Sequence, residues 1–348
     1  MTYRTVLILL VMAVFSIGAA FYGISSRTNV QTTNFNGERL FPGLLENAKT
    51  ITEVEIVQAG KPLIFEIKGG GWTLRNSGGY PVHNNLITKV ILSIASMELL
   101  ESKTALEKRH AILDLGDPMV PGTDSQRVTM KNADGDVLSD IIVGSANFFL
   151  PETTTGGMYV RRPGEMQTYL VRGLVDIGEQ PRNWLVRDIV DINTDDVARV
   201  EVTQPDGEKL NVIPQEDATG GYVFENLPDG LKLTSAFAPR NIAALVNGFV
   251  LNDVRRDADA PLDDSEAYVA DFTLNSGMTV NMRIWRVGEN QYLRISAAPG
   301  AAAPDSDAAK LVQEISAKSQ GWTYIIPEYQ YEQISVKMAD ITAPIEGS

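Results

Sequence analysis

The sequence has 348 residues, of which 44% are hydrophobic and 21% are charged, and its formal net charge at pH 7 is −14. This composition is typical of folded globular proteins, and the length favours two domains. The negative charge argues against nucleic acid or an anionic lipid surface as a ligand of the folded body. The chain has no cysteine, which excludes disulfides. It has only two histidines, His83 and His110, which argues against a histidine-rich metal site. We expect no metal or other cofactor.

The N-terminal segment Val6–Ile24 is apolar and carries no charge. As a helix it would span about 28 Å, close to the hydrocarbon thickness of a bilayer. Arg4 favours a cytoplasmic tip (residues 1–5) with the remaining chain on the other side. A cleaved signal peptide is the alternative, because Gly18-Ala19-Ala20 resembles a cleavage site. With a retained anchor, 6–24, we expect a single-pass inner-membrane protein whose C-terminal body is periplasmic.

After a polar linker, residues 25–50, one series of predicted elements occurs twice. Each copy begins with three strands joined by glycine turns: 54–57, 63–67 and 72–74 in the first copy, then 200–203, 210–213 and 222–224 in the second. Each meander precedes a helix that is predicted from apolar residues at 3.6-residue spacing, over 86–100 and 242–250.

Further strands are predicted after each helix. Residues 127–130 and 137–142 flank an Asp-Gly pair that favours a hairpin, and their counterparts are 268–274 and 280–285. The closing strands are 158–163 and 168–171 in the first copy, and 322–327 and 331–334 in the second. The second copy also has an insertion, 297–319, with a short helix at 308–317.

The predicted order is βββ-α-ββ-ββ, twice. It indicates an α+β protein made of two tandem repeats of antiparallel sheet with one packed helix each, behind an N-terminal transmembrane helix. We place the first repeat at 51–182, a connecting segment at 183–197 and the second repeat at 198–345.

Two adjacent arginines, Arg161 and Arg162, are the sharpest local positive charge in this acidic chain, with Tyr159 before them and Glu165 after. Consecutive strand residues point to opposite faces, so at most one of the two lines a given surface. They could bind a carboxylate, a phosphate or an acidic patch on a partner. The structural alternative is an edge-strand charge that opposes aggregation. We take these four residues as candidate ligand-binding or partner-binding residues.

Other motifs favour structural interpretations. Five acidic residues within 257–266 could bind calcium, but the glycine of the EF-hand loop is missing and Pro261 interrupts the run, which favours a solvated loop. Neither histidine lies near a nucleophile motif, so we predict no catalytic residues and no enzyme. The tryptophans could stack on sugars, although their predicted positions favour core packing: Trp72, Trp184, Trp285 and Trp322.

Several stretches resemble a bacterial family. The most specific is Gly157–Glu165 (GMYVRRPGE), and others are Leu40–Leu44, Gly79–Val82 and Gly321–Tyr329. They resemble the family catalogued as domain of unknown function 4340. The resemblance implies a single-pass extracytoplasmic protein, commonly encoded beside an ABC transporter of the gliding-motility type. It assigns no reaction and no functional residues.

From these observations we expect a non-enzymatic accessory or scaffold protein at the outer side of the cytoplasmic membrane. Its expected partners are ABC transporter membrane subunits or other envelope proteins, which could add a strand to an open sheet edge. The alternative is an extracytoplasmic ligand-binding module that holds a cell-wall fragment or a small anion in the cleft between the repeats.

Overall fold

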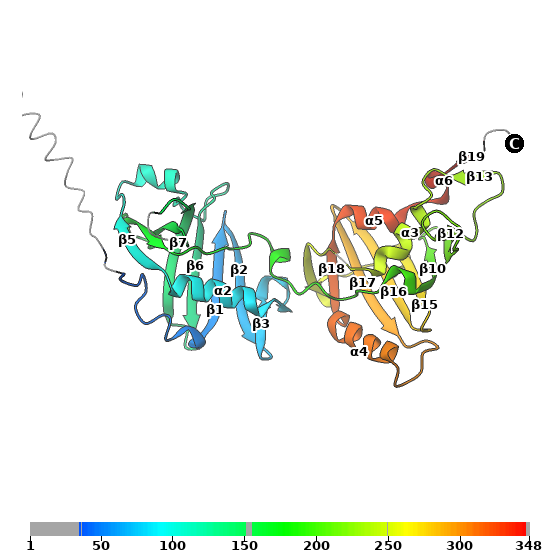
Figure 1. Ribbon diagram of the computed structural model, residues 1–348, viewed down its shortest axis with the longest axis horizontal. Helices are drawn as coiled ribbons and strands as arrows, with labels where there is room; N and C mark the ends of the chain where they lie inside the picture. Colours follow the sequence, from blue (N-terminus) through cyan, green and yellow to red (C-terminus); the bar gives the residue numbers. More distant parts are fainter. Residues whose placement is uncertain (1–34, 36, 151–154, 249, 346–348) are drawn as a thin grey trace, which may run out of the picture. The chain divides into compact units, whose positions relative to one another are not determined.

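The structure is a computed structural model, and it describes residues 35, 37–150, 155–248 and 250–345. The predicted cytoplasmic tip, the transmembrane segment and most of the linker lie outside these residues. Within the described ranges, no helix is both long enough and apolar enough to cross a membrane. The described residues form two large antiparallel sheets with few helices (Figure 1), which confirms the α+β class.

The first sheet has nine strands in the order β4-β3-β2-β1-β6-β7-β8-β9-β5. Its strands are β1 (Ile51–Gln58), β2 (Lys61–Lys68), β3 (Gly71–Leu74), β4 (Tyr80–Pro81), β5 (Glu98–Ser102), β6 (Gln126–Asn132), β7 (Val137–Asn147), β8 (Gly157–Arg161) and β9 (Thr168–Arg172). Segments of one turn precede β1 and follow β3: η1 (Ala48–Thr50) and η2 (Arg75–Ser77).

The second sheet has eight strands in the order β12-β11-β10-β15-β16-β17-β18-β14. They are β10 (Val197–Thr203), β11 (Lys209–Pro214), β12 (Tyr222–Phe224), β14 (Asp253–Arg256), β15 (Tyr268–Leu274), β16 (Thr279–Val287), β17 (Asn290–Ala298) and β18 (Trp322–Ile326). A separate pair joins β13 (Leu231–Leu233) to β19 (Thr342–Pro344) near the end of the chain.

The two strand orders correspond position by position from β3 and β12 to β5 and β14. In both sheets, the strand that follows the helix leaves the chain order and pairs at the edge, β5 with β9 and β14 with β18. The helix before that strand is α2 (Asn84–Ala95) in the first sheet. In the second sheet it is α3 (Ala238–Ala243) continued by η6 (Ala244–Val246).

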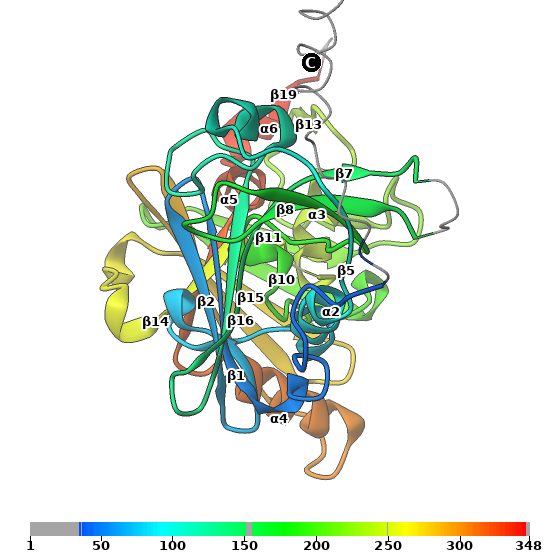
Figure 2. The ribbon, with the colours of Figure 1, turned by 90° about the vertical axis from the view of Figure 1, so that its left-hand side faces the viewer.

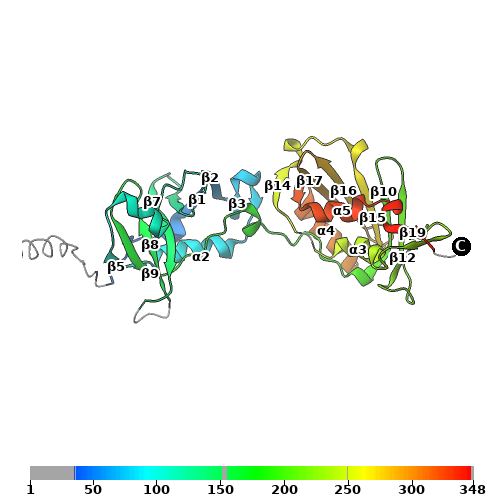
Figure 3. The same ribbon diagram turned by 90° about the horizontal axis from the view of Figure 1, so that it is seen from above.

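Helices cover one face of the second sheet. Besides α3, they are α4 (Asp307–Ser319) and α5 (Glu328–Ser335), followed by the single turn α6 (Met338–Ile341). Figure 3 shows these helices on one side of the strands and the segment 257–267, drawn in yellow, on the other. That segment contains η7 (Asp257–Asp259) and η8 (Asp264–Glu266). It covers an apolar cluster on the outer face: Ala267, Trp285, Tyr292 and Ile325.

The first sheet has a corresponding covering segment between its edge strand and the next strand of the chain. It runs over residues 103–125 and contains η3 (Glu107–Leu113). Leu115 within it is fully buried. Each covering segment therefore connects the edge strand, β5 or β14, to β6 or β15.

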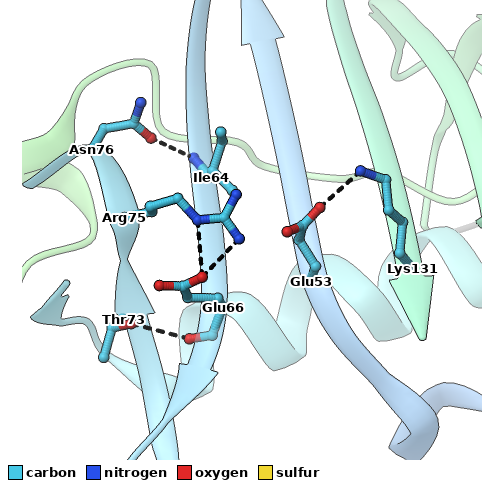
Figure 4. Close-up of polar contacts among 7 residues, drawn as sticks. All are labelled: Glu53, Ile64, Glu66, Thr73, Arg75, Asn76 and Lys131. Atoms are coloured by element: carbon cyan, nitrogen blue, oxygen red, sulfur yellow. Dashed lines mark hydrogen bonds and ion pairs between the residues drawn. The ribbon is translucent and has the colours of Figure 1, made fainter. Parts of the chain in front are cut away.

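Ion pairs and hydrogen bonds connect neighbouring segments of the first sheet (Figure 4). Glu53 on β1 is the register partner of Lys131 on β6, and the Lys131 ammonium lies 2.8 Å from the Glu53 carboxylate. Two residues of η2 contact β2: the Arg75 guanidinium donates to the Glu66 carboxylate, and the Asn76 side chain accepts from Ile64 N–H at 2.8 Å. Such pairs favour one strand register over its alternatives.

The chain also divides into two compact units. The first comprises Met1–Pro62 and Ile87–Ile177, and the second comprises Leu63–Leu86 and Gly178–Ser348. In the chain, η4 (Pro181–Asn183) and η5 (Thr194–Asp196) come between β9 and β10. These two compact units have other boundaries than the predicted repeats. The predicted repeat boundaries stay a prediction.

Three predicted elements differ from the structure. The first helix ends at Ala95, because the chain turns after it and residues 98–102 form β5. The second helix is shorter than predicted and ends at Val246. The predicted strand 331–334 is wrong: these residues belong to α5, which follows Pro327 and buries Tyr331 and Ile334 at helical spacing.

Candidate functional site

Arg161, the last residue of β8, is used to hold the first covering segment in place. Its Nε and Nη2 atoms both donate to the carbonyl of Leu115 at 3.2 Å, and Nη1 donates to the carbonyl of Glu165 at 3.2 Å. Burial lowers the pKa of Arg161, and the charges of Asp117 and Glu107 oppose that effect. The guanidinium therefore binds backbone carbonyls of its own chain.

Arg162 attaches the start of the described chain to the same end of the sheet. Its Nη2 donates to the carbonyl of Leu40 at 3.1 Å. The guanidinium also lies over the rings of Phe41 and Tyr169, at 6.0 Å and 5.8 Å from their centroids. Its nearest carboxylate is that of Glu165, at 3.9 Å. Cation–π contacts of this kind add modest stability.

Of the four predicted site residues, Arg161, Arg162 and Glu165 lie at the β8–β9 turn, whereas Tyr159 lies within β8. Their side chains do not converge on one space. The Tyr159 hydroxyl accepts a hydrogen bond of 3.4 Å from Asn147, and Arg161 and Arg162 hold different segments. These contacts support a structural role for the arginines. The predicted edge-strand role is wrong, because β8 pairs with β7 on one side and with β9 on the other. The role of the four residues in binding a ligand or partner stays a prediction.

The first unit instead exposes large apolar side chains. Phe149 is 93% exposed, Ile112 76% and Phe148 71%. Leu106 and Met166 are also exposed. Single exposed apolar residues are ordinary, but neighbouring groups of them mark interaction surfaces. We refer to these five residues as the exposed apolar set.

Contacts bring the elements that carry this set close together. The His110 ring nitrogen of η3 lies 2.9 Å from the carbonyl of Met166. The end of η3 packs directly on β7 at Gly144, where a Cβ atom would lie 2.1 Å from the carbonyl oxygen of Leu113. From Gly144, β7 continues with β8 into a projecting hairpin (Figure 2). Phe148 and Phe149 directly follow the end of β7.

A pocket of about 450 Å³ opens beside η3. The end of β5 and the residues after it form one wall, with Lys103 and Thr104, and η3 forms the other, with Arg109 and Ile112. Lys103 pairs with Glu101 at 2.5 Å, whereas Arg109 has no ion pair within the described part of the chain. The volume lies in the range of small-molecule pockets. The surface around η3 thus combines exposed apolar groups with two basic residues, Lys108 and Arg109, that have no ion pair among the described residues.

Three acidic residues of the second covering segment make structural contacts. Asp263 caps η8: its carboxylate accepts from the Ser265 hydroxyl at 2.7 Å and from Ser265 N–H at 2.9 Å, and these two hydrogen bonds lower the pKa of the carboxyl group. Asp264 pairs with Arg283 at 3.0 Å, and Asp257 accepts from the Thr323 hydroxyl at 2.6 Å. Among the described residues, no group of three potential ligands could hold a metal ion.

The four tryptophans are buried, in agreement with the core positions predicted for them. Trp184 donates to the carbonyl of Gly178 at 3.0 Å, and Trp285 donates to the carbonyl of Asp263 at 2.8 Å. Their rings therefore fix chain segments to the sheets.

Sequence reasoning missed two threonines that act with the arginines. Thr168 is the register partner of Arg161, is fully buried, and donates its hydroxyl to the carbonyl of Thr104 at 2.9 Å. In the second sheet, the Arg294 Nε donates to the hydroxyl of Thr323, which is also fully buried. The only signal in the sequence is an arginine on one strand and a threonine on the next strand of the sheet. Charge and hydropathy patterns do not single out such a pair.

The fold and the surface around η3 define an α+β protein of two matched antiparallel sheets, each with a covering segment. The model of the family described as domain of unknown function (DUF4340) matches residues 72–271. This match covers more than half of the 348 residues, so the chain belongs to that family. The resemblance drawn from the sequence is thereby confirmed. No curated protein and no solved structure gives a match.

Proposed function

We propose that this chain is a membrane-anchored, extracytoplasmic accessory protein that binds envelope proteins through its first unit and is not an enzyme. The observation that carries the proposal is the exposure of Phe148 and Phe149, at 71% and 93%, at the end of β7. Exposing two consecutive phenylalanines to water is unfavourable, and burying them against a partner would gain free energy. Aromatic residues are also enriched in protein–protein interfaces.

The position of the anchor supports contact with a partner in the membrane. Phe35, the first described residue, packs edge-on against Tyr169 with ring centroids 6.1 Å apart. Ten residues separate it from Ile24, the end of the predicted transmembrane segment. Even fully extended, such a stretch reaches at most about 40 Å. The first unit is therefore held near the membrane, where the membrane subunits of an ABC transporter would meet it.

We also propose that the two sheets are tandem repeats of one ancestral unit. The matching strand orders support this, and so does a shared pair of side chains. Arg161 donates to Leu115 of the first covering segment, and Arg294 donates to the carbonyl of Ala260 in the second at 2.8 Å. In both sheets, the arginine and its partner threonine fasten the covering segment to the outer face. The repeat explains why one chain contains two such sheets.

Co-purification from native membranes tests the proposed binding. A tagged full-length chain should recover an envelope partner, with ABC transporter membrane subunits as the expected class. The double variant Phe148→Ser/Phe149→Ser should recover at least about tenfold less, since central aromatic residues dominate interface energies. Val287→Ser is the matched control, because Val287 is also exposed but lies in the second unit. Equal recovery by all three proteins would contradict the proposal.

The proposed location has its own test. In intact spheroplasts, protease added from outside should degrade the body of the protein and leave a cytoplasmic marker protein uncut. Protection of the body from external protease, with cleavage only after the spheroplasts are lysed, would exclude an extracytoplasmic body.

A further inference from the structure

The outer face of the second sheet carries a row of cross-strand pairs on β16 and β17. The covering segment 257–267 lies over one end of this row, where Trp285 belongs to its apolar cluster. The following two pairs are polar and lie beyond that cluster. In order along the row, the register partners are Trp285 and Tyr292, Arg283 and Arg294, and Asn281 and Ser296.

The pair formed by Arg283 and Arg294 is unusual because like charges directly opposite each other destabilise a sheet. Carboxylates of the covering segment offset this cost. Asp264 lies 3.0 Å from Arg283, and Asp257 lies 3.3 Å from Arg294. Asp271 is a third nearby acid, which accepts from Asn281 at 2.7 Å. The region therefore has no excess of positive charge.

The first sheet is different at the same position. Arg161 of β8 corresponds to Arg294 of β17. The register partner of Arg161 on β7 is Ile142, which is buried. The first sheet thus closes this position with an apolar side chain, whereas the second sheet places a second arginine there. The shared strand arrangement therefore does not require an arginine at this position.

Several polar atoms at this position have no partner among the described residues. Arg294 uses Nε for Thr323 and Nη2 for backbone carbonyls, which leaves Nη1 free. Arg283 makes one ion pair, through Nη1. The Ser296 hydroxyl is exposed and has no hydrogen bond in the described structure. Free donors therefore lie beside acceptors such as the second carboxylate oxygen of Asp257.

These groups line a pocket of about 350 Å³, to which Gln320 and Trp322 also contribute. We propose that this pocket binds a neutral saccharide. A sugar hydroxyl both donates and accepts hydrogen bonds, so it matches neighbouring donors and acceptors in a charge-balanced site. A simple anion would match only the arginines and would meet the carboxylates of Asp257 and Asp264. The volume suits one or two sugar rings.

Isothermal titration calorimetry on the full-length chain, in a detergent without a sugar head group, tests this site. The probes are N,N′-diacetylchitobiose and maltose as neutral disaccharides, with glucose 6-phosphate and inorganic phosphate as anions. We expect a disaccharide to bind, and we expect Arg283→Met to weaken that binding at least about tenfold. Ser296→Leu, which fills the pocket from an exposed position, should have the same effect.

Arg286→Met is the matched control. Arg286 lies on the same strand, has a side-chain exposure of 44% against 42% for Arg283, and also makes one ion pair, but it lies outside the pocket. It should bind the disaccharide like the unchanged protein. The proposal is overturned if neither disaccharide binds, if inorganic phosphate binds as tightly as the disaccharide, or if Arg286→Met weakens binding as much as Arg283→Met and Ser296→Leu.

Discussion

Arg161 and Arg162 show how two adjacent residues of one type can serve separate segments. The first binds the carbonyl of Leu115 in the covering segment, and the second binds the carbonyl of Leu40 near the start of the described chain. The sequence identifies the pair as exceptional but cannot say what it contacts, because Leu40 and Leu115 are far away in the chain. Long-range hydrogen bonds to backbone carbonyls leave no local pattern.

Replacing Arg162 with methionine should therefore affect stability rather than binding. Loss of the hydrogen bond to Leu40 and of the contact with Phe41 should lower the free energy of unfolding by about 1.5 kcal/mol. Urea denaturation measures this change. Arg109→Met is the control, since Arg109 is exposed and has no ion pair among the described residues, and it should change stability by less than about 0.5 kcal/mol.

Partner recovery distinguishes a stabilising role of Arg162 from a partner-binding role. The methionine variant should recover as much envelope protein as the unchanged chain in the co-purification. Normal stability together with lost recovery would instead identify Arg162 as a partner-binding residue.

Among the elements, the hairpins follow most directly from the sequence. The predicted turn between β6 and β7 is present, and Gly135 adopts a φ of 85° that suits glycine. By contrast, β17 was missed because Tyr292 and Leu293 are adjacent and both buried, so its apolar pattern does not alternate. The covering segment provides the second buried face.

The packing of η3 on β7 gives a prediction about Gly144. An alanine Cβ there would lie 2.1 Å from the carbonyl oxygen of Leu113 and 2.7 Å from that of Asp114, so backbone must move. We expect Gly144→Ala to lower the free energy of unfolding by about 3 kcal/mol. Chemical denaturation of the variant measures the loss.

Gly71→Ala is the control for this experiment. The same added Cβ at Gly71 in β3 would meet nothing closer than the Asn84 side chain at 3.7 Å, which is ordinary contact. That variant should keep nearly the full stability. Similar stabilities for the two alanine variants would show that η3 does not press against β7.

For the whole molecule, the sequence predicted two matched sheets and the family, while the two compact units and the outer-face pocket required the structure. The pocket depends on the register of Arg283 with Arg294 and on where the covering segment stops, which are both long-range features. The predicted membrane segment and its orientation lie outside the described residues and stay predictions.

Buried tyrosines make the second unit sensitive to high pH. Burial, together with the hydrogen bond to Tyr268, raises the pKa of Tyr331 from 10.0 to about 12, and burial also raises the pKa of Tyr80 and of Tyr324. In the unfolded chain these groups ionise near pH 10. The stability that the neutral tyrosines contribute is therefore fully present below pH 10 and is lost as the pH rises through about 12.

Thermal denaturation at a series of pH values should show the melting temperature falling across this alkaline window. Tyr331→Phe removes one of the ionising groups, so its melting temperature should fall less steeply over the same range. A Tyr331→Phe curve parallel to that of the unchanged protein would show that Tyr331 ionises equally in the folded and unfolded states.

The most direct measurement of the proposed function is photocrosslinking in intact cells. A photoreactive phenylalanine analogue replaces Phe149 in one strain and Val287 in another, and both chains keep their N-terminal segment. We predict that position 149 forms a crosslink to another envelope protein and that position 287 does not. The absence of a crosslink from position 149, or equal crosslinking from both positions, would contradict a partner-binding surface on the first unit.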